Sequence, residues 1–277
     1  MTVRARCAAL LVGIMLGGVG CTSQTPNAIG TPVASAPAVS SLPLPVPPEP
    51  VADPAAPTRP TGPTLVATFR LALVADPCVD RDLAAPAIGE ALTILDRSYA
   101  LPADFQPADL VPASQAGLTG SSGTKLVRAS MLDDLRAMHD AWEAAGLAMI
   151  VESAYRSYGA QRATFDSWAA RLGTAEALRR SARPGHSEHQ LGTAFDLTSP
   201  GWGGRFGDWA TESAEGAWMV EHAWEYGFVM SYPAGAEAET CFSYEPWHWR
   251  WIGREAAAAQ HASGEVLRAF LVRSADD

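Results

Sequence analysis

The chain has 277 residues, a formal net charge of −10 at pH 7 and a hydrophobic content of 48%. The acidic balance argues against nucleic acid as a partner, because binding phosphate groups needs clustered lysine and arginine, whereas Lys125 is the only lysine. The length and the hydrophobic content are ordinary for a globular protein of one or two domains.

The first twenty residues have the pattern of an export signal. Arg4 and Arg6 precede an apolar run at 7–20, which is shorter than the ~20 residues of a comfortable membrane span. Small residues then precede Cys21 and resemble a bacterial lipoprotein cleavage box, although Gly18 stands where a large aliphatic residue is usual. We predict a signal peptide at 1–20 and a lipid on Cys21, which would anchor an exported protein in the cell envelope. The alternative is a signal peptide that is cut later and releases a secreted protein.

Residues 21–63 are rich in Pro, Ala, Ser and Thr and show no apolar periodicity. Such a composition cannot bury enough apolar surface to offset the entropy of ordering, so we predict a disordered tether. The remaining residues, 64–277, are expected to form a single folded domain.

Export also determines how the four cysteines are interpreted. Cys7 would leave with the signal and Cys21 would be lipidated, which leaves Cys78 and Cys241 in an oxidising compartment. Two remaining cysteines in an exported domain usually pair, and a disulfide closing so long a loop stabilises by ~5 kcal/mol on the chain-entropy model. The alternative is that Cys241 binds a metal.

Periodicity and turn residues predict the elements of the domain in chain order. We expect strands at 65–74, 147–151, 228–230 and 241–252, helices at 83–95, 130–146, 165–172, 218–226 and 254–271, and a proline-rich extended segment at 96–111. Helices mixed with short strands joined by turns indicate an α+β fold.

The clearest helix is the one that opens at Ser130, a candidate N-cap. Four apolar residues follow at spacings of four, three and four, which places them on one face of a helix; they are Met131, Leu135, Met138 and Trp142. Gly146 is the expected stop.

A stretch at 184–197 concentrates side chains that bind metals. His189 and Asp196 are separated by Gly192 and Thr193, which argues against one continuous helix. We expect His189 in a loop and Asp196 on the next strand, where alternation directs Phe195 into the core. Imidazole and carboxylate are zinc ligands, and catalytic zinc sites use three protein ligands plus water.

A second group lies downstream, where Glu245 and His248 are three residues apart. On a flat strand they would face opposite sides, so the backbone must turn at Pro246-Trp247 for both to reach one site. His248 then becomes the third ligand, and Glu245 the general base that takes a proton from water.

Other candidates remain open. His186 is a rival ligand near the site, whereas we expect Glu188 to face solvent. Arg156, directly after a predicted apolar strand, suits binding a carboxylate or stabilising an oxyanion, or it pairs with a surface acid. The histidines on predicted helices have no partner motif and are interpreted as structural; they are His139, His222 and His261.

Together these segments resemble the zinc D-Ala-D-Ala carboxypeptidases of the VanY type, within the LAS peptidase group. The resemblance covers roughly residues 95–272. The motifs match, in order, at Tyr155-Arg156-Ser157 with Gln161, at Ser187, His189 and Asp196, and at Glu245 and His248. The chain departs from the family at His186, where an aromatic residue is usual, at Ser231, where we expect arginine, and at a chain-specific loop, 199–217.

The resemblance implies a hedgehog/DD-peptidase-like α+β fold, a small antiparallel sheet flanked by helices in a single catalytic domain. It implies one Zn²⁺ per chain on His189, Asp196 and His248, with Glu245 as base and Arg156 at the substrate carbonyl or carboxylate. It also implies that Gln161 and Ser187 line the substrate cleft.

The predicted function is therefore that of a membrane-tethered, monomeric zinc carboxypeptidase that removes the C-terminal D-alanine from peptidoglycan stem peptides. An L,D-carboxypeptidase or a peptidoglycan endopeptidase fits the same residues. From a different class, a non-catalytic cell-wall-binding lipoprotein is the remaining alternative.

Overall fold

The computed structural model describes residues 77–86, 91–202 and 206–276, all within one unit of the chain, 41–277. The predicted signal peptide, Cys21, the tether at 21–63 and the strand expected at 65–74 lie outside the described residues. Within the described ranges, no helix combines the length and the apolar character that crossing a membrane requires.

The described residues form short strands, α-helices and 3₁₀ turns that alternate along the chain. The strands are β1 (Leu83–Ala84), β2 (Tyr99–Ala100), β3 (Leu110–Pro112), β4 (Thr119–Gly120), β5 (Leu126–Arg128), β6 (Ile150–Ser153), β7 (Ala194–Thr198), β8 (Phe228–Met230) and β9 (His248–Trp251). The α-helices are α1 (Leu132–Ala144), α2 (Tyr158–Leu172), α3 (Thr174–Arg180), α4 (Trp209–Glu212), α5 (Ala214–His222), α6 (Glu237–Thr240), α7 (Arg254–Ser263) and α8 (Leu267–Asp276). The 3₁₀ turns are η1 (Ala113–Ala116), η2 (Ala129–Met131), η3 (Glu188–Leu191) and η4 (Ala223–Tyr226).

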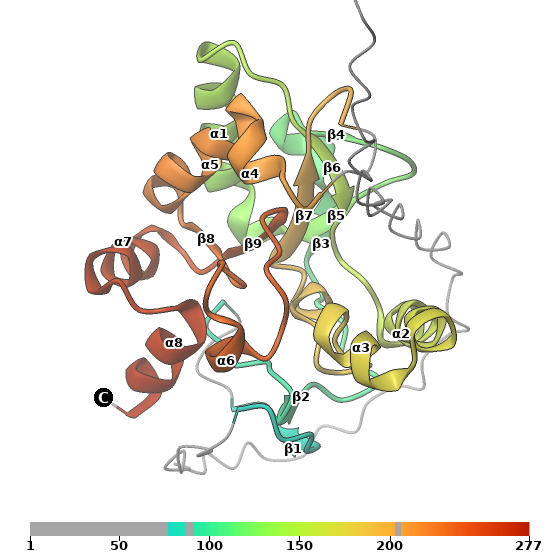
Figure 1. Ribbon diagram of the computed structural model, residues 1–277. Coiled ribbons are helices and arrows are strands. Elements are labelled where there is room, and N and C mark those ends of the chain that lie inside the picture. Colours follow the sequence, from blue (N-terminus) through green and yellow to red (C-terminus); the bar gives the residue numbers. More distant parts are fainter. Residues whose placement is uncertain (1–76, 87–90, 203–205, 277) are drawn as a thin grey trace, which may run out of the picture. The chain divides into compact units, whose positions relative to one another are not determined.

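The largest sheet in the described part of the chain has five strands in the order β4-β6-β7-β9-β8 (Figure 1). The β4–β6 pair is parallel, and the three other pairs are antiparallel. In register, Asp196 on β7 lies opposite His248 on β9 and opposite Ser153 on β6. The small, mainly antiparallel sheet with surrounding helices confirms the predicted α+β class.

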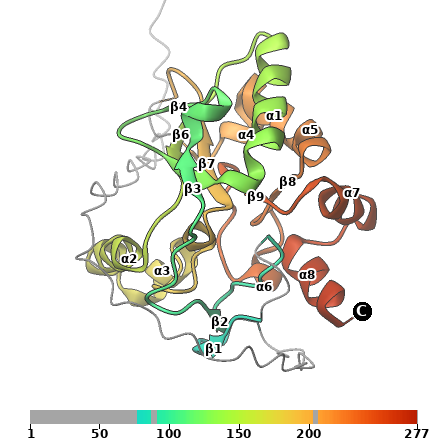
Figure 2. The same cartoon turned by 180° about the vertical axis from the view of Figure 1, so that it is seen from behind.

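The two faces of this sheet have different neighbours. Phe195, Leu197 and Trp249 belong to the main hydrophobic cluster, which also contains the α1 stripe of Met131, Leu135, Met138 and Trp142. Figures 1 and 2 both show α1 and α5 next to each other, and Trp142 of α1 meets Trp218 of α5 edge to face, with ring centroids 6.4 Å apart. Because side chains alternate along a strand, Asp196 and His248 face away from this core.

A second, smaller hydrophobic cluster lies against the C-terminal helices. Val229 and Ile252 pack there against the C-terminal helices, through Leu267 and Phe270 among others. The prediction of a single helix at 254–271 is wrong in one respect, because the segment forms two helices. The first, α7, ends before Gly264, which has a positive φ of 68°. This break lets α8 fold back and bring its apolar residues onto the cluster.

The helix expected at 83–95 is wrong wherever the structure describes it. Leu83–Ala84 pairs with β2 as a strand, and residues 91–95 form turns and irregular backbone. The reason is tertiary: the carbonyl groups of Ala91 and Thr93 accept hydrogen bonds from the buried guanidinium of Arg250, so they are not available to a helix.

Smaller differences concern element ends. Ser130 lies inside a 3₁₀ turn and does not cap α1, whose N-cap is Met131 without a side-chain hydrogen bond. The strand expected at 147–151 lies instead at Ile150–Ser153, as β6. Of the strand expected at 241–252, only His248–Trp251 forms a strand, β9. Leu172, the last residue of the helix expected at 165–172, ends α2 and is 37% exposed.

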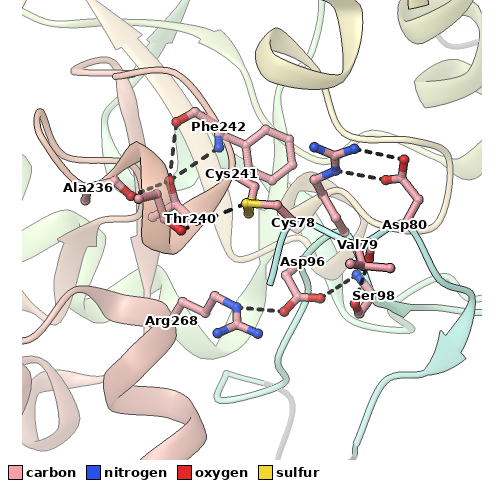
Figure 3. The surroundings of a disulfide bond; sticks show 12 residues. Cys78, Val79, Asp80, Asp96, Ser98, Ala236, Thr240, Cys241, Phe242 and Arg268 are labelled. Atoms are coloured by element: carbon pink, nitrogen blue, oxygen red, sulfur yellow. Dashed lines mark hydrogen bonds and ion pairs between the residues drawn. A yellow bond between two sulfur atoms is a disulfide. The ribbon is translucent and has the colours of Figure 1, made fainter. Parts of the chain in front are cut away.

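A disulfide joins Cys78 to Cys241, as predicted, with their Cα atoms 5.2 Å apart. Figure 3 shows that it connects the beginning of the described chain to the turn after α6. Nearby, Asp96 accepts a hydrogen bond from Arg268, which ties the same region to α8. The bond rules out Cys241 as a metal ligand, because its sulfur is already used.

Replacing both cysteines, Cys78→Ser with Cys241→Ser, should lower the free energy of unfolding by about 2–5 kcal/mol, since the bond closes a long loop. Denaturant unfolding of both proteins measures this, and mass spectrometry of the unreduced wild type should show the two cysteines linked. Equal stabilities, or free thiols at both positions in the exported protein, would contradict the expectation.

Candidate metal centre

Three side chains from distant parts of the chain meet on the polar face of the sheet. They are His189 in η3, Asp196 on β7 and His248 on β9, and one potential ligand atom from each lies within 4.8 Å of the others. His189 Nε2 is 3.3 Å from Asp196 Oδ2, and His248 Nδ1 is 3.1 Å from Asp196 Oδ1. The predicted set of ligand residues is therefore assembled in space.

Local backbone geometry explains how His189 and Asp196 converge. Gly192 ends η3 with a positive φ of 74°, a conformation that glycine adopts at little cost. A Cβ at this position would also come within 2.9 Å of Leu110. The chain can thus reverse between the turn that carries His189 and the strand that carries Asp196.

The turn expected at Pro246-Trp247 is present. The backbone N–H of His248 donates to the carbonyl of Glu245 at 3.1 Å, and β9 begins only at His248. The carboxylate of Glu245 consequently approaches the centre, with Oε2 4.0 Å from His248 Nδ1.

The donor set fits zinc. Two ligands held ~2.0–2.1 Å from one tetrahedral zinc ion lie about 3.3 Å apart, which is close to the separations between Asp196 and the two imidazoles. His189 Nδ1 donates to the carbonyl of Ala154 at 2.8 Å, leaving Nε2 for a metal. His248 Nε2 is 2.9 Å from Glu188 Oε2, leaving Nδ1. Second partners of this kind are typical of metal-binding histidines.

The electrostatics of the centre favour a cation. Burial would raise the pKa of Asp196, but His189 and His248 hold it well below its usual range. Burial lowers the pKa of His189, which favours the neutral imidazole that binds metals. Burial also disfavours the charged form of His248, yet hydrogen bonds to Asp196 and Glu188 outweigh this and raise its pKa to about 10.

Glu245 is in a different state from the other carboxylates. Burial raises its pKa to about 8; His248 opposes this rise and Asp196 adds to it. A carboxyl group whose pKa lies near neutrality can both accept and return a proton, and a cation among the three ligands would favour its ionised form.

Arg156 follows β6 and reaches the same centre. Its Nη1 donates to Gln161 Oε1 and its Nη2 to Ser153 Oγ, each at 2.8 Å, and Nη2 lies 3.7 Å from Asp196 Oδ2. Gln161 uses its own amide nitrogen on Ser181 and the carbonyl of Ala182. Gln161 therefore holds the guanidinium of Arg156 in position. That Gln161 also lines the substrate cleft remains a prediction.

Two further residues of the motif region are buried. Ser187 directly precedes η3. His186, the rival ligand, donates from Nδ1 to the carbonyl of Asp96 at 2.7 Å and has Nε2 3.1 Å from Asp82. It therefore connects the His189 loop to the N-terminal segment and does not join the metal ligands.

The expectation that Glu188 faces solvent is wrong. Glu188 is only 4% exposed, and its carboxylate contacts His248, Arg250 and Ser231. Alternation along one segment cannot reveal such a contact, because its partners lie much later in the chain, on β9 and directly after β8. The only local signal was the position of Glu188 between two histidines.

The three histidines that were predicted on helices contact neighbouring side chains of the fold. His261 stacks on Trp224 with ring centroids 4.3 Å apart, and His222 contacts Glu225. His139 forms a second group with two exposed acids of α1, Asp140 and Glu143; exposed acids of this kind are common without a metal.

The segment 199–217 is more than a loop. It contains α4 and the beginning of α5, and the buried indole of Trp209 donates to Ser199 Oγ at 2.7 Å. Phe206 packs against Trp247, beside Glu245, with ring centroids 5.4 Å apart.

A buried His-Asp-His set on one face of a sheet, with a free carboxylate and an arginine beside it, defines the centre of a mononuclear zinc hydrolase. Comparison with known proteins narrows this class. The model of the VanY family, described as D-alanyl-D-alanine carboxypeptidase, matches residues 124–254. The chain belongs to this VanY family of zinc peptidases.

Similar proteins support the assignment. The putative carboxypeptidase YodJ of Bacillus subtilis (strain 168) is 35% identical over 60% of this chain and 61% of its own length. The LD-carboxypeptidase LdcB has a solved structure with 34% identity and a TM-score of 0.58, covering 64% of this chain and 83% of LdcB. A mutant of the vancomycin-resistance D,D-pentapeptidase VanY, solved with Zn(II), has 28% identity and a TM-score of 0.55, covering 66% and 99%.

The chain spans only about half to three fifths of the length of the first curated relatives that it matches.

If the centre is assembled as described, His248→Ala should remove bound zinc, whereas His186→Ala should leave about one zinc ion per chain. Both substitutions delete a buried imidazole near the same loop, so the second controls for loss of packing. Elemental analysis of the folded, dialysed proteins decides the matter. Zinc retained by the first variant, or lost selectively by the second, would refute the ligand assignment.

Proposed function

We propose that this protein is a zinc-dependent carboxypeptidase that removes the C-terminal D-alanine from peptidoglycan stem peptides. The observation that carries the proposal is the position of Glu245, whose carboxylate, 13% exposed, lies next to the metal ligands but outside the ligand set. A purely structural zinc site has no need of such a group.

His189, Asp196 and His248 would hold the zinc ion. When bound, zinc supplies a Lewis acid that polarises a peptide carbonyl and acidifies a water molecule. Glu245 is placed to accept the proton of that water and then to deliver it to the leaving amine, the D-alanine nitrogen. The turn at Pro246 holds Glu245 in position for both transfers.

Arg156 would bind the negative charge of the substrate. Its Nη atoms are fixed by Ser153 and Gln161, while its buried Nε has no hydrogen-bond partner within the described part of the chain. A rigid guanidinium with a spare donor suits the terminal carboxylate of a peptide, or the oxygen that gains charge during hydrolysis. Ser187 remains a proposed contact of the substrate.

The similar proteins leave a second specificity open. The D,D activity is supported by the VanY family and by the structure of the D,D-pentapeptidase VanY, whereas LdcB, an LD-carboxypeptidase, has comparable similarity. An L,D-carboxypeptidase therefore remains the alternative within the same mechanism. Its substrate would be a tetrapeptide, from which D-alanine is released by cleavage after an L-centre.

For the cellular setting we propose export and attachment to the membrane through a lipid on Cys21, followed by the tether at 21–63. A monomer acting at the cell wall needs no further protein partner for this chemistry. The support for this part is the pattern of the N-terminal sequence.

Glu245→Ala should keep the fold and about one zinc ion per chain, yet lose hydrolysis by about 10²-fold or more, because general acid–base catalysis contributes that much. Release of D-alanine from a muropeptide measures the rate. Glu239→Ala, which removes an exposed carboxylate from the preceding helix α6, is the matched control and should act like the wild type. Full activity in the Glu245 variant would refute its role as base.

Penta- and tetrapeptide muropeptides assayed side by side test the substrate. We expect faster release of D-alanine from the pentapeptide, and no release after the zinc has been removed with a chelator. Faster hydrolysis of the tetrapeptide would establish the L,D alternative instead. Internal cleavage without release of an amino acid would indicate an endopeptidase, and binding without hydrolysis a wall-binding protein.

A further inference from the structure

Glu188 occupies an unusual place for a glutamate. It directly precedes the metal ligand His189 in η3 but points away from solvent, and both of its carboxylate oxygens are engaged. Oε2 is 2.9 Å from His248 Nε2 and accepts from Ser231 Oγ at 2.6 Å, while Oε1 accepts from Arg250 Nη1 at 2.7 Å. With its oxygens occupied in this way, Glu188 is not available as a metal ligand.

The position of its partners follows from the strand. His248 and Arg250 are two residues apart on β9, so both side chains extend from the same face of the sheet. One carboxylate can therefore contact both of them, one through each oxygen. His248 and Arg250 thus both bind the carboxylate of Glu188.

Arg250 makes this arrangement rigid. Its side chain is completely buried, and its Nη2 donates to the carbonyl groups of Ala91 and Thr93 at 2.9 and 2.5 Å. Ser231, at the end of β8, adds a third donor to the carboxylate. Glu188 is consequently held by three donors, of which only His248 belongs to the ligand set.

The chemical consequence concerns the orientation of the His248 ring. A carboxylate accepts but does not donate, so the contact with Glu188 fixes a proton on Nε2. Nδ1 faces the carboxylate of Asp196. It is therefore Nδ1 that would give up its proton to a metal shared with Asp196, while Nε2 keeps its proton for Glu188. A ring turned over about its χ2 bond would lose the Glu188 contact and would present a carbon atom to the ligand set.

The geometry points to Glu188 as a positioning residue of the metal centre, which orients His248 for zinc through a carboxylate anchored by Arg250 and Ser231. This inference rests on the metal site of the proposed function and not on its substrate. It also assigns a role to Ser231 and to Arg250, as the groups that anchor the carboxylate.

The test is the zinc affinity of Glu188→Gln in the full chain, measured by competition with a chromophoric chelator. Loss of such an outer partner typically weakens metal binding about 10- to 100-fold, and we expect a value in this range. The matched control is Asp96→Asn, which also neutralises a buried carboxylate paired with an arginine, Arg268. The control should lose thermal stability but keep its zinc affinity within about twofold, because Asp96 contacts no metal ligand through its side chain.

Ser231→Ala provides a milder variant in case Glu188→Gln does not fold. It removes one neutral donor and leaves the ion pair intact, so zinc binding should weaken by about 2- to 10-fold, the equivalent of one hydrogen bond. Unchanged zinc affinity in every folded variant, or an equal loss in Asp96→Asn, would overturn the inference. If the protein binds zinc but releases no D-alanine, the proposed substrate fails, while these affinities still decide the role of Glu188.

Discussion

The pairing of β7 with β9 is the constraint on which the rest of the molecule depends. It sets Asp196 opposite His248 and Phe195 opposite Trp249, so the same register builds the metal centre on one face and the core on the other. A slip of one residue would exchange the two faces and bury Asp196 against α1. Packing and chemistry therefore specify the same register. Burial of the apolar face of the strands fixes which residues face the metal centre.

Buried charge is the second constraint. On the polar face, Glu188 pairs with Arg250 and Asp196 lies near Arg156, while burial raises the pKa of the neighbouring Glu245 to about 8. Removing one partner of a buried pair typically costs 3–5 kcal/mol, because an uncompensated charge remains. Hydrogen bonds to Asp196 and Glu188 raise the pKa of His248 to about 10, so its charged form compensates these carboxylates. A divalent cation among the three ligands would take over the compensation of Asp196.

Much of the centre could be predicted from the sequence because its signals are local. The spacing of His189 and Asp196 around a glycine, and the proline between Glu245 and His248, each prescribe a backbone turn that the structure contains. The burial of Glu188 could not be predicted in this way, since its partners lie 43 to 62 residues away. The helix expected at 83–95 failed for the same reason, because a distant arginine uses the carbonyl groups of that segment.

Anomalous X-ray diffraction at the zinc absorption edge, on crystals of the full chain grown with zinc, would locate the metal without reference to any substrate. The structure predicts one strong peak about 2.0–2.2 Å from His189 Nε2, His248 Nδ1 and a carboxylate oxygen of Asp196. A peak bound instead at His139 and Glu143 on α1, or no ordered zinc on the polar face of the sheet, would contradict it.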